Sequence, residues 1–113
     1  MGKDSRLGGR TRTRLNAQVR ARDACPVCPL CGYPIDRSLP RTPKPHPLSS
    51  VVDEWLPRAL GGQVDLANCV ESHRLCNGIK SDAWPVTPAL RAKCVEAVRD
   101  LYETGETIID RPW

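Results

Sequence analysis

Cysteine and histidine residues form two groups whose spacing suits a metal ion. Cysteines at positions 25, 28 and 31 make two overlapping C-x-x-C pairs, and two thiolates spaced this way on a tight turn can both point at one ion. Farther along the chain, His73 and Cys76 lie three residues apart, which is one helical turn, so both side chains leave the same face of a helix. We therefore expect one C-x-x-C pair to hold a structural Zn²⁺ ion together with His73 and Cys76. Disulfides, or burial of the cysteines as small apolar residues, are the alternatives.

A longer stretch, residues 51–80, brings the second group together with acidic, glycine and amide residues. Period-two alternation at 51–56 and again at 66–70, separated by a Gly-Gly loop, predicts a β-hairpin. No proline follows until Pro85, so we expect a helix to begin near Glu71 and to carry the later polar residues. The polar and turn residues of the stretch are, in order, Asp53, Glu54, Pro57, Gly61, Gly62, Asn68, His73, Cys76, Asn77 and Lys80.

This ordered set of residues resembles the HNH endonuclease family. The family motif has an acidic residue or histidine followed by histidine or glutamate, then proline, two glycines, asparagine, and finally C/H-x-x-C-(H/N)-x-x-K. The match covers roughly a quarter of the chain, and nearly half once Cys28 and Cys31 are included. The resemblance implies an α+β fold: a small ββα-metal (HNH, or His-Me finger) domain stapled by a structural zinc, with flanking N-terminal and C-terminal helices.

The resemblance also selects among the cysteines. The form Cys28-Pro-Leu-Cys31-Gly, with Pro-Ile-Asp shortly after it, is similar to the knuckle that precedes the motif in zinc-containing HNH proteins. Cys25 is then a spare thiol, although whether Cys25 or Cys28 supplies the first zinc bond stays open. Family members commonly have cysteine where His73 stands, and imidazole is an equally good zinc ligand. The competing role for His73 is binding of the catalytic metal, one turn before Asn77.

For the chemistry, the resemblance implies a second ion and a general base. Asp53 and Asn77 match the residues that bind the catalytic ion, and a carboxylate with an amide oxygen suits Mg²⁺ or Mn²⁺. Glu54 matches the general base, which in the family is most often histidine, a stronger base than glutamate. Asn68 matches the asparagine that hydrogen-bonds backbone across the hairpin loop and so orients the base. Outside this motif, Asp53 and Glu54 would be interpreted as an exposed acidic pair.

Basic residues are concentrated in the first part of the chain, and phosphate is the expected partner for such a stretch. The chain has 17 Lys and Arg against 13 Asp and Glu, a net charge of +4. We expect residues 1–10 to be a disordered basic tail and residues 11–23 to form a short basic helix with Leu15 and Val19 on a thin apolar stripe. Solvated surface charges are the alternative. We expect contacts to the DNA backbone from four basic residues: Arg20, Arg22, Arg58 and Lys80.

At 113 residues, the chain is expected to form a single domain, because it is too short for two independent cores. We assign residues 11–113 to this HNH domain. Within it, residues 25–83 hold the zinc knuckle and the ββα-metal core, and residues 87–105 form a C-terminal helix.

Turn and cap residues place the remaining elements. Thr87 is expected to be the N-cap of the C-terminal helix, with Pro88 at the first helical position and Gly105 at the end. Apolar residues recur in this helix at intervals of three and four, so we expect Cys94 to be part of the core. Four prolines at 40, 43, 45 and 47 predict an extended connector, in which His46 is expected to be solvated.

The expected function is a metal-dependent endonuclease that hydrolyses DNA phosphodiester bonds with low sequence specificity, since the motif addresses backbone and groove shape. The rival is a zinc-binding DNA-binding or adaptor module without catalysis. Short HNH proteins are frequent in bacteriophages, so the resemblance implies a role in genome packaging with terminase subunits as partners. Normal packaging and end formation after replacement of Glu54 would count against that role.

The start of the chain and its hydropathy set the expected compartment. The sequence begins Met-Gly-Lys-Asp-Ser-Arg without an apolar signal region, and it has no apolar run of membrane-spanning length. We therefore expect no membrane contact and a reducing cytoplasm, that of the host cell if the protein is phage-encoded. A secreted, disulfide-rich protein is the distant alternative.

Overall fold

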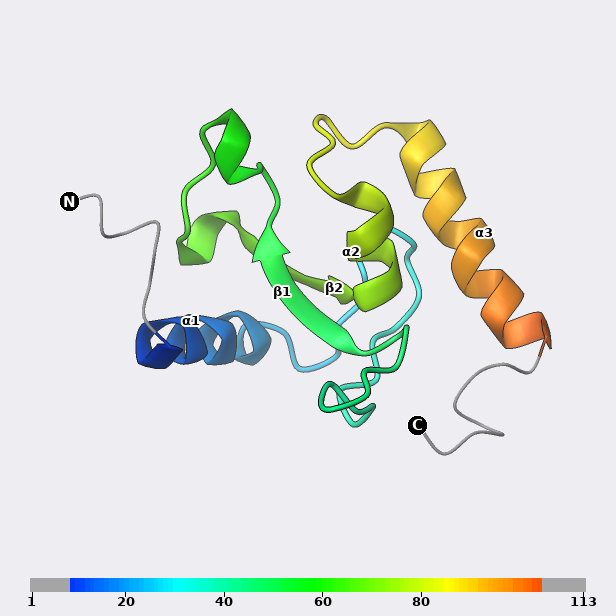
Figure 1. Ribbon diagram of the computed structural model, residues 1–113, viewed down its shortest axis with the longest axis horizontal. Helices are drawn as coiled ribbons and strands as arrows, with labels where there is room; N and C mark the ends of the chain where they lie inside the picture. The colour runs from blue at the N-terminus through cyan, green and yellow to red at the C-terminus, as the bar shows by residue number, and fades with distance from the viewer. Residues whose placement is uncertain (1–8, 105–113) are drawn as a thin grey trace.

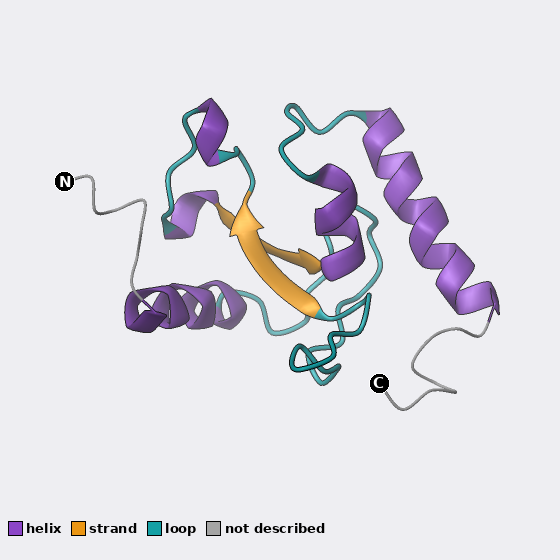
Figure 2. Ribbon diagram, viewed as in Figure 1, coloured by secondary structure: helices purple, strands orange, loops and turns teal. Residues whose placement is uncertain are grey.

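The computed structural model describes residues 9–104 of the chain. Over this range, three α-helices combine with one two-stranded antiparallel sheet (Figures 1 and 2), which confirms the α+β class. None of the helices in this range is long and apolar enough to cross a membrane. The elements are, in order, α1 (Gly9–Ala21), β1 (Ser50–Glu54), the 3₁₀ turns η2 (Arg58–Leu60) and η3 (Leu66–Asn68), β2 (Cys69–His73), α2 (Arg74–Lys80) and α3 (Pro88–Thr104).

Apolar side chains pack against the sheet from both of its faces. Helix α1 lies on one side of the sheet and α2 on the other, with α3 beyond α2 (Figure 1). On the α1 side, Leu15 and Val19 are buried against Cys69 and Val52, as the thin apolar stripe predicted. The larger core lies on the α2 side and joins the cysteine knuckle to α2 and α3. Its buried members are Cys28, Leu30, Cys31, Ile35, Leu48, Cys76, Cys94 and Val98.

The second strand and the helix after it begin later than the sequence predicted. Strand β2 pairs antiparallel with β1, and Val52 lies opposite Glu71, whereas the expected strand was 66–70. The first part of that expected strand forms η3 instead. The Asp65 side chain accepts a hydrogen bond from the Asn68 backbone N–H at 2.9 Å and closes this turn. Helix α2 consequently starts after β2 rather than near Glu71, because the residues before it are paired with β1.

Two adjacent glycines allow the loop between the strands to turn back on itself. Gly61 has φ of 98° and ends η2 in the left-handed conformation, which L side chains rarely adopt. Gly62 lies directly against the Leu56 carbonyl, and a Cβ atom there would overlap the carbonyl oxygen. The two glycines are therefore required for different reasons, one for its φ angle and one for close approach.

The ends of the outer helices follow local capping rules. The Thr87 hydroxyl accepts a hydrogen bond from the Leu90 backbone N–H at 3.1 Å, so Thr87 is the N-cap of α3 as predicted. The expected C-terminal glycine, Gly105, lies outside the described residues, as do residues 1–8 of the expected disordered tail. Gly9 and the residue after it were assigned to that tail, but they form the start of α1.

The proline-rich connector is ordered around His46, which the sequence analysis wrongly placed in solvent. The His46 side chain is fully buried, and its Nδ1 accepts a hydrogen bond from the Leu48 backbone N–H at 2.9 Å. Its own backbone N–H donates to the Pro40 carbonyl at 3.0 Å. Prolines in this segment lack N–H groups, and the side chain and the backbone of His46 both make hydrogen bonds that hold the connector in its turn.

Arginines of α1 and of the chain just after it bind the backbone of the sheet. Arg20 donates to the Ser50 hydroxyl at 2.9 and 3.0 Å. Arg22 donates to the carbonyls of Leu66 and Cys69, each at 2.7 Å. Both arginines were predicted to contact DNA, and both are engaged within the protein in this structure. Their contact with DNA stays a prediction, and their visible role is to fix α1 on the sheet.

A buried carboxylate on β2 ties three segments together. Glu71 accepts hydrogen bonds from Arg37 at 2.7 and 3.0 Å and from the Ser50 hydroxyl at 2.7 Å. Arg20 lies 3.7 Å from the same carboxylate. Burial raises the pKa of Glu71, but the hydrogen bonds from Arg37 and Ser50 outweigh burial and hold the pKa below its ordinary value of 4.5.

Replacing Glu71 by glutamine is expected to lower the free energy of unfolding by about 3 kcal/mol, because it leaves two arginines partly buried without their counter-charge. The depressed pKa means that the carboxylate stabilises the fold above pH 4.5 and that this contribution is lost as the pH falls through the folded pKa. Urea unfolding at neutral pH and at stepwise lower pH measures both effects. Glu96→Gln, on the exposed surface of α3, is the matched control, and an equal loss in the two variants would contradict the assignment.

Candidate metal centre and the adjoining acidic cleft

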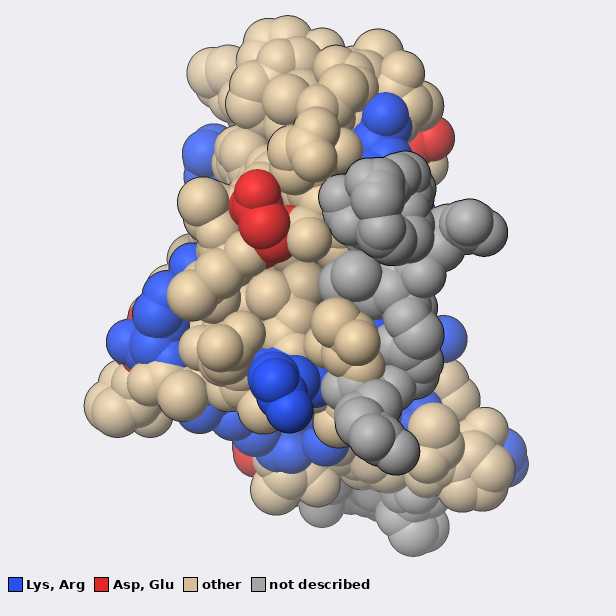
Figure 3. All heavy atoms as spheres, turned by 90° about the vertical axis from the view of Figure 1, so that its left-hand side faces the viewer, with Lys and Arg blue, Asp and Glu red and all other residues tan. Residues whose placement is uncertain are grey.

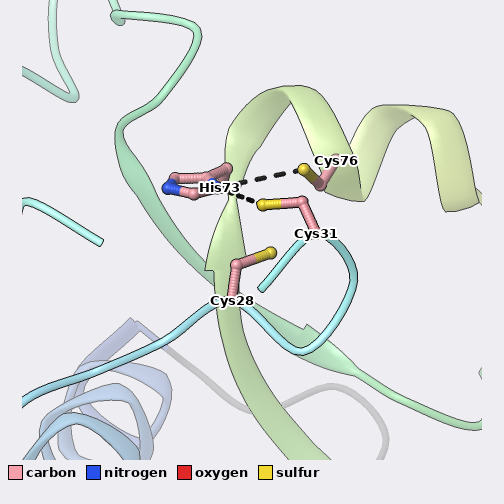
Figure 4. Close-up of side chains that lie close together, drawn as sticks. All are labelled: Cys28, Cys31, His73 and Cys76. Carbon is pink, nitrogen blue, oxygen red and sulfur yellow. Dashed lines mark hydrogen bonds between the residues drawn. The ribbon is translucent and has the colours of Figure 1, made fainter. Parts of the chain in front are cut away.

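Four buried side chains converge to make a compact metal-binding cluster (Figure 4). Cys28 and Cys31 come from the knuckle, His73 from the end of β2, and Cys76 from α2. Their potential ligand atoms all lie within 4.8 Å of one another. The sequence analysis predicted this set of four residues, and the structure brings all four together.

The spacing of the ligand atoms fits a tetrahedral zinc ion. With Zn–S bonds of about 2.3 Å and a Zn–N bond of about 2.0 Å, an ideal tetrahedron has S···N separations of about 3.5 Å and S···S separations of about 3.8 Å. The Nδ1 atom of His73 lies 3.3 Å from the Cys31 sulfur and 3.9 Å from the Cys76 sulfur. Shifts of well under an ångström therefore bring these atoms to zinc-binding distances. Three thiolates and one imidazole form a closed structural set rather than an open catalytic one.

Backbone groups around the cluster orient its ligands. The Nε2 atom of His73 lies 3.0 Å from the Pro34 carbonyl, an acceptor that places the ring proton on Nε2 and leaves Nδ1 to face the sulfurs. The Tyr33 backbone N–H donates to the Cys31 sulfur at 3.5 Å. Gly32, at φ of 81°, makes the knuckle turn in which its own N–H donates to the Cys28 carbonyl at 2.8 Å.

His73 reaches the cluster from a strand end and not from within a helix. It is the last residue of β2 and the N-cap of α2, whereas the sequence analysis placed it one helical turn before Cys76. His73 and Cys76 still converge, because the N-cap residue is adjacent to the first turn of the helix, where Cys76 lies.

The thiols of the cluster hold their protons unequally, and hydrogen bonds with Cys28 and Cys31 raise the pKa of Cys76. Hydrogen bonds from the side chains of Cys31 and Cys76 lower the pKa of Cys28, so a thiolate is stabilised there. Burial lowers the pKa of His73, but hydrogen bonds to the sulfurs of Cys28 and Cys31 outweigh burial and raise it to about 10. A thiolate beside an imidazolium is an internal ion pair in which a bound Zn²⁺ would take the place of the proton. Cys25 is exposed and lies outside the cluster.

A polar cleft lies at the end of β1. It has a volume of about 360 Å³, and it brings together two residues of the strand with residues that follow α2. The Asp53 carboxylate accepts a hydrogen bond from the Glu54 backbone N–H at 2.9 Å. The residues that line the cleft are Asp53, Glu54, Pro57, Arg58, Ala59, Ser81 and Asp82.

Glu54 is held between two arginines. Its carboxylate lies 3.2 Å from a guanidinium nitrogen of Arg12 and 3.5 Å from Arg58, and its side chain is only 8 % exposed. Arg12 also donates to the Val52 carbonyl at 2.9 Å. The sequence analysis counted Arg12 only as one of many basic residues near the N-terminus. No sequence signal connects Arg12 to Glu54, because 42 positions separate the two residues.

No protein-family model, no curated protein and no solved structure matches this chain. The described residues form a small α+β domain with a Cys₃His cluster able to hold a structural metal such as zinc. The catalytic roles stay predictions from the sequence motif.

Of the two residues predicted to bind the catalytic metal, Asp53 lines the cleft and Asn77 does not. Asn77 is a half-buried residue of α2 whose carbonyl accepts a hydrogen bond from the Ser81 backbone N–H at 2.9 Å. The residues that line the cleft on this side are Ser81 and Asp82, which directly follow α2. Ser81 has φ of 48°, and this left-handed residue turns the chain directly before Asp82. The sequence analysis missed Asp82, although it follows directly on the last residues of the motif.

Asn68 makes the contacts that the family resemblance implied for it. Its side-chain oxygen accepts from the Leu56 backbone N–H at 3.0 Å, and its amide donates to the carbonyls of Leu56 and Gln63 at 3.0 and 2.9 Å. These three bonds join the two ends of the loop that follows β1. Asn68 therefore fixes the backbone beside Glu54 and does not itself line the cleft.

The two remaining residues predicted to bind DNA differ in exposure. Arg58 lines the cleft, and its side chain is 52 % exposed. Lys80 is only 3 % exposed, and its ammonium group lies 5.8 Å from the centre of the Trp55 ring. Lys80 therefore packs inside the protein in a cation–π contact, so this structure supports a structural role for it rather than a phosphate contact.

Proposed function

We propose that this protein is an HNH-type, divalent-metal-dependent endonuclease that hydrolyses DNA phosphodiester bonds. The observation that carries the proposal is the polar cleft at the end of β1, which holds Asp53 and Glu54 beside the chain leaving α2. Strand β1, strand β2 and helix α2 follow one another in the order expected of a ββα-metal unit. The Cys₃His cluster acts as the zinc staple that fixes the knuckle to this unit.

In the proposed reaction, Glu54 accepts a proton from the water that attacks the phosphodiester. Asp53 would supply a carboxylate, a hard ligand suited to Mg²⁺ or Mn²⁺, whereas the second predicted ligand, Asn77, is not among the residues that line the cleft. The ion, when bound, stabilises negative charge on the phosphate and on the leaving oxygen. Arg58, which lines the cleft, would bind a phosphate oxygen, and Asn68 holds the loop that carries these groups.

The charge of the protein supports a nucleic-acid substrate. The chain carries a net charge of +4. On the face at the left of Figure 1, basic side chains occupy several places and acidic side chains few (Figure 3). A polyanion is attracted to such a face mainly through its phosphates, which suits cleavage of DNA with low sequence specificity. Phage terminase subunits stay the predicted protein partner.

A second candidate is a zinc-stapled DNA-binding or adaptor module without catalysis. The observation that favours it is the pairing of Glu54 with both Arg12 and Arg58, since both carboxylate oxygens are then engaged in ion pairs within the protein. The two candidates differ in their metals. The binding module needs one tightly bound zinc ion, whereas the nuclease needs a second and weaker divalent ion as well.

Incubation of the zinc-loaded protein with supercoiled plasmid tests the proposed function. We expect conversion to open-circular or linear DNA when Mg²⁺ or Mn²⁺ is added, and no conversion when these ions are withheld. Gel electrophoresis separates the three plasmid forms. Binding of DNA without cleavage under every divalent ion would reject the nuclease and support the binding module.

A further inference from the structure

Helix α1 lies outside the proposed ββα-metal unit, yet it sends one side chain to the carboxylate of the cleft. One guanidinium nitrogen of Arg12 contacts Glu54 at 3.2 Å, and the other donates to the Val52 carbonyl at 2.9 Å. The two contacted residues both belong to β1, where Val52 precedes Glu54 by two positions. The guanidinium thus spans one strand and is bound to it at two points.

This pair of contacts fixes the direction of the carboxylate. A guanidinium is a rigid planar fork, so its bond to the Val52 carbonyl determines where its second nitrogen meets Glu54. Arg12 is itself partly buried, with 30 % of its side chain exposed, while Arg58 on the other carboxylate oxygen is 52 % exposed and 3.5 Å away. The two arginines are therefore unequal, and Arg12 is the more firmly anchored.

Helix α1 is attached to the sheet by apolar packing and by hydrogen bonds. Leu15 and Val19 are buried against the sheet, and Arg20 binds the Ser50 hydroxyl near the other end of the helix. These contacts hold the middle and the C-terminal part of α1 on the sheet, and Arg12 adds a contact nearer the start of the helix.

We infer that Arg12 is a positioning residue for Glu54 in the proposed cleavage reaction. Helix α1 then contributes to the nuclease site by orienting this carboxylate. This inference rests on the proposed function and adds a residue to it. Without Arg12, the contact of the carboxylate that remains within residues 9–104 is that with Arg58, which draws it toward the loop and away from the β1 backbone. Misplacement of a reacting group by about 1 Å costs up to about 100-fold in rate, so we expect kcat to fall about 10- to 100-fold.

Steady-state plasmid cleavage by three full-length variants tests the inference. Arg12→Ala is expected to lower kcat with little change in KM, and Arg12→Lys, which keeps a donor for the carboxylate, is expected to recover part of the loss. Arg14→Ala is the matched control, because it removes the same charge from an exposed position of the same helix. An unchanged kcat in Arg12→Ala, or a rise in KM alone that equals that of Arg14→Ala, would overturn the inference.

Two further measurements separate the possible failures. Zinc content and circular dichroism establish that each variant is folded, and urea unfolding of Arg12→Ala, Glu54→Ala and the double variant tests the pair without reference to activity. We expect the two losses of stability to be less than additive, and strict additivity would overturn the contact. If the wild type fails to cut DNA, the proposed function fails and the inference fails with it. If the wild type cuts and Arg12→Ala cuts equally well, only the inference fails.

Discussion

Replacing Cys76 by serine is expected to release the metal and to unfold the protein at room temperature. Structural zinc sites contribute apparent binding free energies of about 10–16 kcal/mol at neutral pH, while whole domains are stable by only about 5–15 kcal/mol. A serine hydroxyl is a poor zinc ligand. Loss of one ligand is therefore enough to remove most of the stability of a chain of this size.

The position of the cluster in the core explains why the effect should be global. Cys28, Cys31 and Cys76 belong to the same buried cluster as residues of α3, so the ligands are also core side chains. The chain has no phenylalanine, and few large apolar groups are available to hold the knuckle against α2 in the absence of metal. Small domains of this kind depend on such a staple.

Metal analysis and thermal unfolding of the purified protein measure this prediction. We expect one zinc ion per chain in the wild type, none in Cys76→Ser, and loss of the cooperative unfolding transition in the variant and in wild type treated with a strong chelator. Cys25→Ser is the matched control, because Cys25 is exposed and lies outside the cluster. Retention of stoichiometric zinc in Cys76→Ser, or its loss in Cys25→Ser, would refute the ligand assignment.

The second large effect is expected for Glu54→Gln, which should reduce cleavage of plasmid DNA by about 10²- to 10⁴-fold, the usual contribution of a general base. Glutamine has nearly the shape of glutamate and still offers an oxygen to Arg12, but it cannot take a proton from water. The rate at saturating protein, measured over a single turnover with Mg²⁺ or Mn²⁺, isolates the chemical step from DNA binding.

A structural control accompanies this measurement. Zinc content and the unfolding midpoint of Glu54→Gln show whether the fold is preserved, since the variant loses a charge that faces two arginines. Glu96→Gln, on the exposed surface of α3, makes the same chemical change away from the cleft and should cut normally. A folded Glu54→Gln protein that cuts within about threefold of the wild-type rate would exclude Glu54 as the base.

The sequence by itself determined the features that depend on near neighbours. The knuckle needs only the C-x-x-C spacing with Gly32, the second ligand pair needs only the step from His73 to Cys76, and Thr87 caps α3 through a residue three positions away. In each case the geometry is set within one turn of chain, so residue type and spacing suffice. The paired glycines of the hairpin loop belong to the same class, because local φ and local crowding require them.

Only the tertiary structure decided where the long polar side chains end. Arginines and lysines span several ångströms with many rotamers, so sequence position does not reveal whether they meet solvent, DNA or the protein itself. Arg22 donates to the Cys69 carbonyl of β2, Lys80 makes a cation–π contact with Trp55, and the side chain of His46, within the connector, is buried. Arg12 reaches Glu54 across 42 positions of sequence. That contact exists because α1 packs on one face of the sheet, a long-range arrangement that no local pattern encodes.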